Sequence, residues 1–222
     1  MAERPWRPPP RIAVVDSGIG VHHPGVRGMV TVAAAFAVDD DGRVQQEPPG
    51  RDHLGHGTAV AATIGAHLRG AVLESLRVLD RTPHCSIAAL CAALELCAGR
   101  DIAFVNISLG IAAADATPGL CARLLAAVQL LVARGCTVVA PVADALGRAA
   151  LPGTLAGVDG VLADGNATAA PTCSERDGAR VWHASPLPPP GIAGLPQARV
   201  QGASLAVAHV VGHLAALRAA TH

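Results

Sequence analysis

The sequence predicts an α/β fold in which helices cover both faces of a mostly parallel β-sheet, giving three layers. Short apolar runs alternate along the chain with longer segments whose apolar residues recur at helical spacing. Such alternation favours parallel strands that are connected by helices. A chain of 222 residues, 51% of them hydrophobic, can bury a substantial core. We expect residues 1–222 to form a single domain, with the Pro- and Arg-rich residues 1–10 flexible.

The first half of the chain supplies strands and helices in alternation. Residues 11–18, RIAVVDSG, are a short apolar run closed by a turn signal, which predicts a buried strand with Asp16 at its carboxyl end. The next element is a helix of small residues, which can pack very close to its neighbours; it spans 55–68. The elements after it are predicted as a strand at 71–80, a helix at 86–100 and a strand at 101–110.

The second half continues this order and then becomes irregular. Residues 118–135 predict a helix, with proline at the start and glycine at the end, and a strand follows at 136–144. From about residue 150 to 200 the chain is rich in glycine and proline, which predicts short strands and long surface loops. The last predicted helix, 202–220, has alanine, glycine and valine on a close-packing face.

The charge and hydropathy of the chain exclude several classes of partner. Its 17 basic and 17 acidic residues balance, so we expect neither nucleic acid nor an anionic membrane as a partner. The N-terminus lacks a signal-peptide core, and no apolar run reaches the roughly 18 residues of a membrane span. We therefore expect a cytoplasmic location.

The six cysteines lack the spacing of a metal site and are expected to be reduced. Cys173 is predicted in a polar loop, where a reactive thiol is an open alternative. Those in or beside apolar patterns are expected to be buried thiols: Cys85, Cys91, Cys97, Cys121 and Cys136.

Three residues far apart in the sequence have the side chains of a nucleophilic triad: Asp16, His56 and Ser204. A hydroxyl is a poor nucleophile until an imidazole takes its proton, and a buried carboxylate must hold that imidazole in the right tautomer. Each residue alone has a plain structural alternative. Asp16 can cap a turn, His56 can simply begin a helix, and Ser204 can be an N-cap.

The three segments, taken in order, resemble the signatures of the subtilisin-like serine proteases. They read Asp-Ser-Gly at 16–18, Gly-His-Gly-Thr at 55–58 and Gly-Ala-Ser-Leu-Ala at 202–206. Four further segments fall in family order, so the resemblance covers most of the chain: HPGV, LRVLD, FVNISLG and LPGTLAGVDGV. The resemblance implies a subtilisin-like fold and a serine endopeptidase that works through an acyl-enzyme intermediate.

The resemblance also implies roles for individual residues. Ser204 would be the nucleophile, His56 would carry the proton and Asp16 would orient His56. The strand segment Ser108, Leu109 and Gly110 would bind the substrate. A peptide or protein substrate would then lie along residues 108–113, with a side chain entering a pocket beside residues 140–144; small residues at 112–114 leave room for a large apolar side chain.

Asp144 is where the sequence departs most from the family. The family carries an asparagine at this place, which donates the second hydrogen bond to the oxyanion, whereas an ionised carboxylate has no proton to donate. Three alternatives stay open. Asp144 is protonated and donates an O–H, it points away while another group serves, or the protein is catalytically weak.

Two readings of the function therefore remain. One is an endopeptidase with a dedicated substrate, such as a peptide precursor. The other is a peptide-binding protein that keeps the cleft while its chemistry has lapsed, as Asp144 and the alanine at 203 suggest. The oligomeric state stays open.

Other polar residues are assigned structural or surface roles. We expect no cofactor and no metal, because the acidic run at 38–42 is typical of a solvated loop. His22 and His23 are expected at the surface. Asn106 is expected to be a hydrogen-bonding residue of the core, and Asn166 to lie in a turn.

Overall fold

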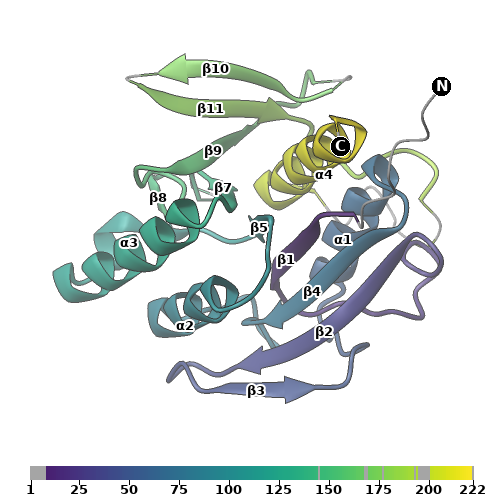
Figure 1. Ribbon diagram of the computed structural model, residues 1–222. Helices are drawn as coiled ribbons and strands as arrows, with labels where there is room; N and C mark the ends of the chain where they lie inside the picture. The colour runs from purple at the N-terminus through teal and green to yellow at the C-terminus, as the bar shows by residue number, and fades with distance from the viewer. Residues whose placement is uncertain are drawn as a thin grey trace.

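The computed structural model describes residues 9–144, 146–167, 170–176, 178–192, 194 and 201–221. The predicted flexibility of the N-terminus falls mostly on residues 1–8, which lie outside this set. Within it, a β-sheet is covered by helices on both faces, as Figure 1 shows. The helices are α1 (His56–His67), α2 (Ile87–Ala98), α3 (Pro118–Ala133) and α4 (Ala203–Thr221).

The central sheet has nine strands in the order β10-β11-β9-β7-β5-β1-β4-β2-β3. Neighbouring strands run parallel except at the two edges, where β3 and β10 pair antiparallel with β2 and β11. This confirms the predicted α/β fold with a mostly parallel sheet. The strands are β1 (Arg11–Asp16), β2 (Val30–Val38), β3 (Val44–Glu47), β4 (Ala71–Arg77), β5 (Phe104–Ile107), β7 (Thr137–Pro141), β9 (Val158–Ala163), β10 (Thr172–Arg176) and β11 (Ala179–Ala184).

A smaller sheet lies outside this order. It pairs the short strands β6 (Ile111–Ala112) and β8 (Ala150–Leu151) antiparallel, and a 3₁₀ turn at Ala113–Asp115 follows β6. The predicted Gly/Pro-rich region after residue 150 contains this β8 together with β9, β10 and β11. The expectation of short strands there is therefore confirmed.

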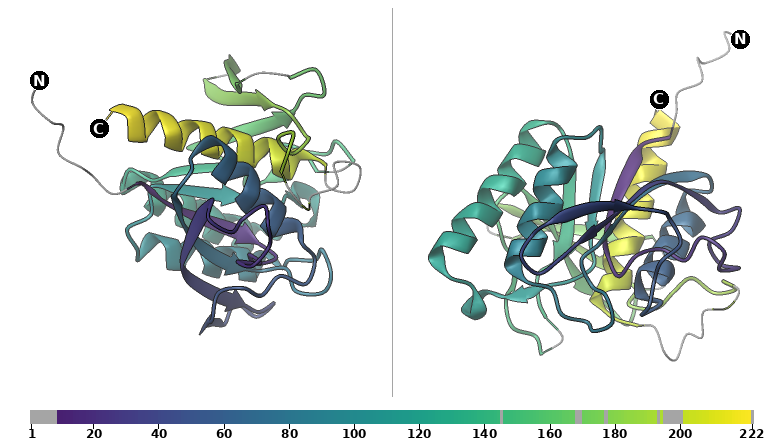
Figure 2. Two further views of the ribbon diagram at one scale, coloured as in Figure 1. Left: turned by 90° about the vertical axis from the view of Figure 1, so that its right-hand side faces the viewer. Right: turned by 90° about the horizontal axis from the view of Figure 1, so that it is seen from below.

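The two faces of the sheet are packed in different ways. On one face, α2 and α3 bury large side chains such as Leu90, Leu94 and Leu124. On the other face, α1 and α4 lie side by side (Figure 2) and bury small residues, including Ala61 and Ala206. Small side chains let the backbones approach closely, as predicted from the composition of both helices.

The last helix, α4, is long and apolar enough to cross a membrane by length and composition. In this structure, however, its apolar side chains are used in packing. Leu205, Val207 and Val211 are at most 1% exposed and belong to the core that α4 shares with α1 and the sheet. The apolarity of α4 is therefore explained by its place in the fold.

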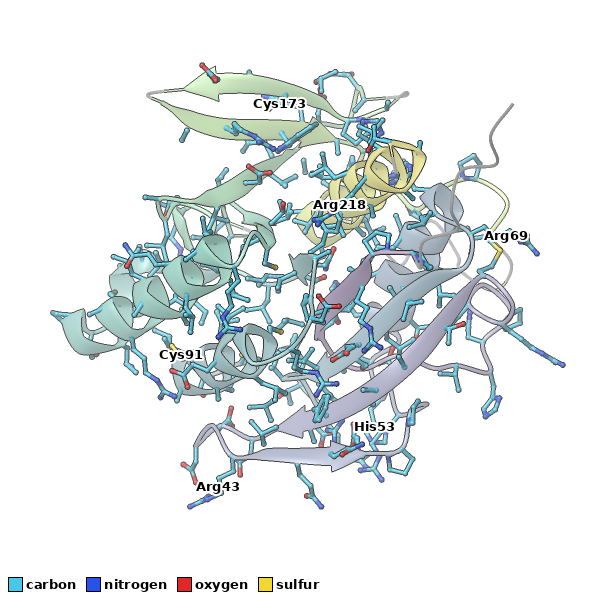
Figure 3. The ribbon with its side chains drawn as sticks, viewed as in Figure 1. Arg43, His53, Arg69, Cys91, Cys173 and Arg218 are labelled. Atoms are coloured by element: carbon cyan, nitrogen blue, oxygen red, sulfur yellow. The ribbon has the colours of Figure 1, made fainter. Side chains whose placement is uncertain are left out.

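Two parts of the sequence prediction need correction. The strand β2 and its partner β3 were not predicted; β2 contains four alanines in VTVAAAFAV, and alanine is a weak strand former. Cys173 was predicted in a loop but lies on the strand β10, where it is exposed (Figure 3). A pattern of small apolar residues does not separate a strand from a close-packed helix.

The parallel arrangement brings three polar residues to one edge of the sheet. β5 pairs with β1 on one side and with β7 on the other. Asp16 ends β1, Ser108 directly follows β5, and Asp144 lies three residues after the end of β7. Because the carboxyl ends of parallel strands lie at the same edge, these residues share one edge of the sheet, and this is where sites form in open α/β sheets.

Candidate active site

The centre of the site is a hydrogen bond between an imidazole and a buried carboxylate. His56 Nδ1 lies 2.8 Å from Asp16 Oδ1 and 2.9 Å from Asp16 Oδ2, and Asp16 is 0% exposed. The carboxylate can only accept, so Nδ1 carries the proton and Nε2 is left with a free lone pair. The backbone N–H of Ser17 donates to Asp16 Oδ1 at 2.6 Å and fixes the carboxylate further.

This contact depends on a very close approach of α1 to the end of β1. A Cβ placed on Gly57 would lie 2.1 Å from Gly18 O and 3.1 Å from Asp16 Oδ1. No side chain larger than hydrogen fits there, so this close approach requires glycine at position 57. The Gly57 N–H also donates to Ser17 Oγ at 2.9 Å, so the helix start and the strand end are joined directly.

A second carboxylate, Asp52, organises the start of α1, and the sequence analysis did not identify it. Its Oδ1 accepts hydrogen bonds from Ser17 Oγ (2.9 Å) and from the N–H groups of Leu54 and Gly55. Its Oδ2 accepts from the N–H and the hydroxyl of Thr58. The available signal was an aspartate four residues before His56, at the start of a helix, where a carboxylate is favourable.

These carboxylates change the proton affinity of His56. Burial of the ring is the largest effect and opposes the charged form. The charge of Asp16, its hydrogen bond to the ring and the charge of Asp52 together outweigh it, so the pKa of His56 is raised above its usual value. An imidazole placed in this way holds a proton more firmly than a free histidine.

Ser204 lies at the start of α4, beside the end of β5. The preceding Gly202 has φ of 141°, a conformation that other residues rarely adopt, and it provides a sharp turn into the helix. The Ser204 hydroxyl donates to Ser108 O at 2.7 Å. Among the described residues no hydrogen bond joins Ser204 to His56, so the hydroxyl is turned toward β5 in this structure.

Asn106 and Asn166 have the kind of environment that was predicted. Asn106 is 0% exposed, and its Nδ2 donates to Ser108 Oγ at 2.5 Å, which braces the segment after β5. Its Oδ1 is buried and has no partner among the described residues. Asn166 lies in a turn and its N–H donates to Asp164 Oδ1.

Asp144 faces its own loop. Its Oδ1 accepts from the N–H groups of Leu146 and Arg148, each at 2.9 Å, and its Oδ2 accepts from Arg148 Nε at 2.7 Å. These hydrogen bonds, led by the one from the Arg148 backbone, hold the pKa of Asp144 below its usual value. The open alternative of a protonated Asp144 is therefore wrong for this structure, because every bond to the carboxylate favours its ionised form.

A groove of about 470 Å³ lies between the segment after β5 and the segment before α2. Leu109 and Gly110 line it, together with Asp144 and Arg148, so the predicted substrate segment and Asp144 share one cavity. The rest of the lining is largely apolar: Leu79, Pro83, His84, Cys85, Ser86, Ile87, Ile111, Ala112 and Leu120.

Part of the predicted substrate segment also belongs to the smaller sheet. Ala112 is 5% exposed, and residues 111–112 are already paired with β8. Ala113 N–H donates to Ala149 O at 3.1 Å, which continues this pairing. One edge of residues 111–113 is therefore occupied by residues 149–151, while Ala112 also lines the groove, so a peptide lying along 108–113 stays a prediction.

Metal-binding and thiol chemistry find no support within the described residues. No group of three or more His, Cys, Asp or Glu side chains in that part of the chain could hold a metal ion. In the run at 38–42, Asp39 accepts from the Asp41 and Arg43 N–H groups, as in an ordinary turn. His22 is exposed and His23 half-buried. All six cysteines are free thiols, and Cys91 on α2 is buried (Figure 3).

Comparison with known proteins identifies relatives of this chain. A family model described as the subtilase family matches residues 10–172, which include Asp16 and His56 but not Ser204. A thermostable alkaline protease of Halalkalibacterium halodurans is 32% identical over 117 residues, covering 48% of this chain and 29% of that protein. The match thus spans less than a third of the curated relative.

Similar solved structures cover nearly the whole chain. A lanthipeptide protease has 17% identity and a TM-score of 0.69, with 94% of this chain and 72% of that chain covered. A cold adapted subtilisin-like serine proteinase has 20% identity and a TM-score of 0.66, with 96% and 76% covered. A prenylagaramide maturation protease has 20% identity and a TM-score of 0.64, with 95% of this chain and 75% of that chain covered. At such identities the likeness shows the fold alone.

Proposed function

The chain belongs to the subtilase family, and from this premise we propose that it is a serine endopeptidase acting on a peptide or protein substrate. The observation that carries the proposal is the hydrogen bond of 2.8 Å between His56 and the buried Asp16. It leaves the Nε2 lone pair free to act as a base. A hydroxyl, that of Ser204, stands at a helix start beside the next parallel strand.

In the proposed reaction Ser204 Oγ attacks the scissile carbonyl carbon while His56 Nε2 takes the hydroxyl proton. Asp16 remains ionised and stabilises the imidazolium. When the tetrahedral intermediate collapses, Nε2 gives the proton to the leaving amine and an acyl-enzyme remains. Water then attacks the acyl group by the same steps. The first step requires the Ser204 hydroxyl to turn from Ser108 O to His56.

Stabilisation of the oxyanion would come mainly from the start of α4. Ser204 is the second residue of this helix, so its N–H has no acceptor within the helix and is free to donate. The helix dipole adds a favourable field for negative charge. Asp144 cannot supply the second hydrogen bond while its carboxylate is ionised and bound to Arg148. We therefore expect a slow enzyme.

A fluorophosphonate probe tests the nucleophile directly. We expect the probe to label the wild-type protein, with the adduct on Ser204 by mass spectrometry, because only an activated serine reacts rapidly. Ser204→Ala should abolish labelling, whereas Ser108→Ala, which removes the neighbouring hydroxyl, should not. Absence of labelling from about pH 5 to pH 9 would refute the proposed hydrolase.

The substrate we propose is a dedicated peptide precursor, cleaved in the cytoplasm. Two solved structures of the same fold are titled a lanthipeptide protease and a prenylagaramide maturation protease. Those are other proteins, and their names support the proposal that a chain with this fold processes a peptide precursor. Incubation of the purified protein with candidate precursor peptides, followed by mass spectrometry, should give a single cleavage. Cleavage of unrelated denatured proteins at many sites would contradict a dedicated substrate.

A second function has one specific observation in its favour. With Asp144 ionised and Ala203 beside the nucleophile, the site has lost two family features, and the Ser204 hydroxyl is bound to Ser108. A non-catalytic peptide-binding protein would keep the groove without hydrolysis. It predicts saturable peptide binding to wild type and to Ser204→Ala alike, with no labelling by the probe.

A further inference from the structure

A pair of histidines forms a direct hydrogen bond on the helical face that carries His56 and Ser204. His67 Nε2 lies 2.8 Å from His209 Nδ1, and His209 Nε2 lies 2.8 Å from Leu187 O. A carbonyl oxygen can only accept, so His209 Nε2 must donate to it. In its neutral form His209 then has a bare Nδ1, and His67 Nε2 must donate to that atom. The short chain of hydrogen bonds thus fixes the proton of both rings.

This chain connects three separate parts of the fold. His67 is the last residue of α1, the helix that begins with His56. His209 lies on α4, six residues after its start and five after Ser204. Leu187 belongs to the segment between β11 and α4. A Cβ placed on Gly212 would lie 2.9 Å from His67 Cβ, so the two helices have little room to adjust.

Among the described residues, no negative charge near His67 and His209 would stabilise a protonated ring. His213 is one turn further along α4 and its ring contacts Trp182 of β11, with the centroids 6.5 Å apart. Arg69, just after α1, is directed at Met29 Sδ. No carboxylate forms an ion pair or hydrogen bond with either ring in the part of the chain that the structure describes.

The remaining charged groups on the neighbouring elements are already engaged. On β11, Arg180 pairs with Asp159 of β9 and His183 lies near Ser174 of β10. On α4, Arg218 stacks over Phe104 of β5. Asp16 at the end of β1 holds His56, and Glu74 of β4, on the opposite face of the sheet, pairs with two arginines.

The proton affinities agree with this geometry. Burial, followed by the charges of His209 and His213, lowers the pKa of His67 from 6.5 to about 4. Burial also lowers the pKa of His209, against the opposing effect of its bond to Leu187 O. Both rings are therefore neutral in the folded protein at neutral pH.

We propose that the hydrogen bond from His67 to His209 is an acid-sensitive latch that holds the end of α1 against α4. A proton added to His209 Nδ1 would place two N–H groups opposite each other at 2.8 Å, and a proton added to His67 would create a positive charge with no partner. A proton on His67 Nδ1 leaves the Nε2–H bond to His209 in place but charges the pair with no carboxylate partner among the described residues. A proton on His209 Nδ1 removes the acceptor, so the hydrogen bond breaks and the two helix segments separate.

The latch regulates the proposed enzyme because α1 and α4 carry its base and its nucleophile. This consequence rests on the proposed function, whereas the latch itself does not. The sign follows from linkage: a histidine whose folded pKa is depressed binds protons more readily when unfolded. Its contribution to stability is therefore complete above pH 6.5 and is lost as the pH falls toward about 4.

The test compares unfolding of wild type and His67→Gln by urea at pH 7.5 and at pH 4.5. The glutamine amide can donate to His209 Nδ1 or, turned over, accept from a protonated His209, so it tolerates both states. Between pH 7.5 and pH 4.5 the folding equilibrium constant should fall in both proteins. We expect the fall to be about tenfold smaller for His67→Gln than for wild type, a figure already reduced because the ring is partly exposed. The matched control is His22→Gln, which removes an exposed histidine and should lose as much as wild type.

Equal losses in wild type and His67→Gln would overturn the latch. If His67→Gln does not fold, His209→Gln makes the same comparison, since its Oε1 can accept from His67 Nε2. A second readout needs no variant: NMR titration of the histidine rings should show at least one of the pair titrating below pH 5, and normal titration of both would also overturn the proposal.

Activity is measured separately so that the two proposals can fail separately. If the pH dependence of unfolding differs between wild type and His67→Gln as expected, but no fluorophosphonate labelling occurs at any pH, the latch stands and the proposed hydrolase fails. If labelling occurs and both variants lose stability as wild type does, the hydrolase stands and the latch fails.

Discussion

Asp16 and Asp144 are carboxylates near the ends of β1 and β7, the two strands that flank β5, yet they have opposite surroundings. Asp16 is fully buried and binds the ring of His56, which lies 40 residues away in the sequence. Asp144 is bound within its own loop, to residues two and four positions later. The same side chain is thus held by the tertiary structure in one region and by local backbone geometry in the other.

The difference shows what determines the chemical use of a carboxylate. The carboxylate of Asp16 is bound to the His56 ring and the Ser17 N–H, so it fixes the orientation of an imidazole from a different element. Asp144 is already satisfied by three hydrogen bonds from its loop, including one from the guanidinium of Arg148. A group whose partners are all local has little capacity left for a substrate.

Of the two carboxylates, substitution of Asp16 is expected to have the larger effect on the rate of reaction. In Asp16→Asn the amide N–H can face His56 Nδ1, which favours the tautomer whose Nε2 already carries a proton. We expect the rate of labelling or peptide hydrolysis to fall by about 10⁴-fold with little change in folding. The rate is measured with the fluorophosphonate probe, and a loss smaller than about tenfold would show that Asp16 does not set the tautomer.

Substitution of Asp144 is expected to have a smaller effect, and to raise the rate of hydrolysis instead of lowering it. In enzymes of this class, loss of one oxyanion donor costs about 10²–10³-fold in rate, so Asp144→Asn should recover part of that, raising hydrolysis at least about tenfold. Asp144→Ala is the matched control, because it removes the charge without adding a donor. If both variants gain equally, charge repulsion and not the missing donor limits the rate.

The backbone beside each carboxylate should differ in its tolerance of a methyl group. Gly57→Ala places Cβ 2.1 Å from Gly18 O, so we expect a loss of about 2 kcal/mol or more in the free energy of unfolding. Gly147→Ala, in the Asp144 loop, meets open space at a φ of 76° and should cost only about 1 kcal/mol. Urea unfolding measures both, and equal losses would contradict the close approach of α1 to β1.

The smallest expected effect concerns the pH dependence of hydrolysis. The base must be neutral, and the raised pKa of His56 means that activity falls with decreasing pH earlier than for an ordinary histidine, by about tenfold per unit below that pKa. Because Asp144 is paired within its own loop, Asp144→Ala should leave the midpoint of this acid limb unchanged. A midpoint that moves with Asp144 would place its carboxylate in contact with His56.

The sequence predicted the parts of the site that are set by local patterns. Asp16 was placed at the end of an apolar strand and His56 at a glycine-flanked helix start by pattern, whereas their meeting was implied by the resemblance to the subtilisin-like proteases. The strand β2 was missed because an alanine-rich run gives no clear period. The sequence also did not identify Asp52, since its five hydrogen bonds depend on how the loop before α1 folds back onto β1.

Contacts between distant segments were beyond the sequence pattern. His67 and His209 are 142 residues apart, and neither lies in a recognisable motif. The pairing of β6 with β8 joins two residues of each strand, too few for a periodic signal. The ionic partner of Asp144 was equally hidden, because an arginine four residues later has several possible directions in a loop.

The helix that carries Ser204 follows every other described strand and helix in the chain, and this order has a consequence during synthesis. As the ribosome releases the polypeptide from its N-terminus, the sheet and α1 can form before α4 exists. Until then the apolar side chains of α1 and the sheet that pack against Leu205, Val207 and Val211 lack these partners. A growing chain therefore contains Asp16 and His56 before Ser204, so the proposed proteolytic activity would have to wait for α4.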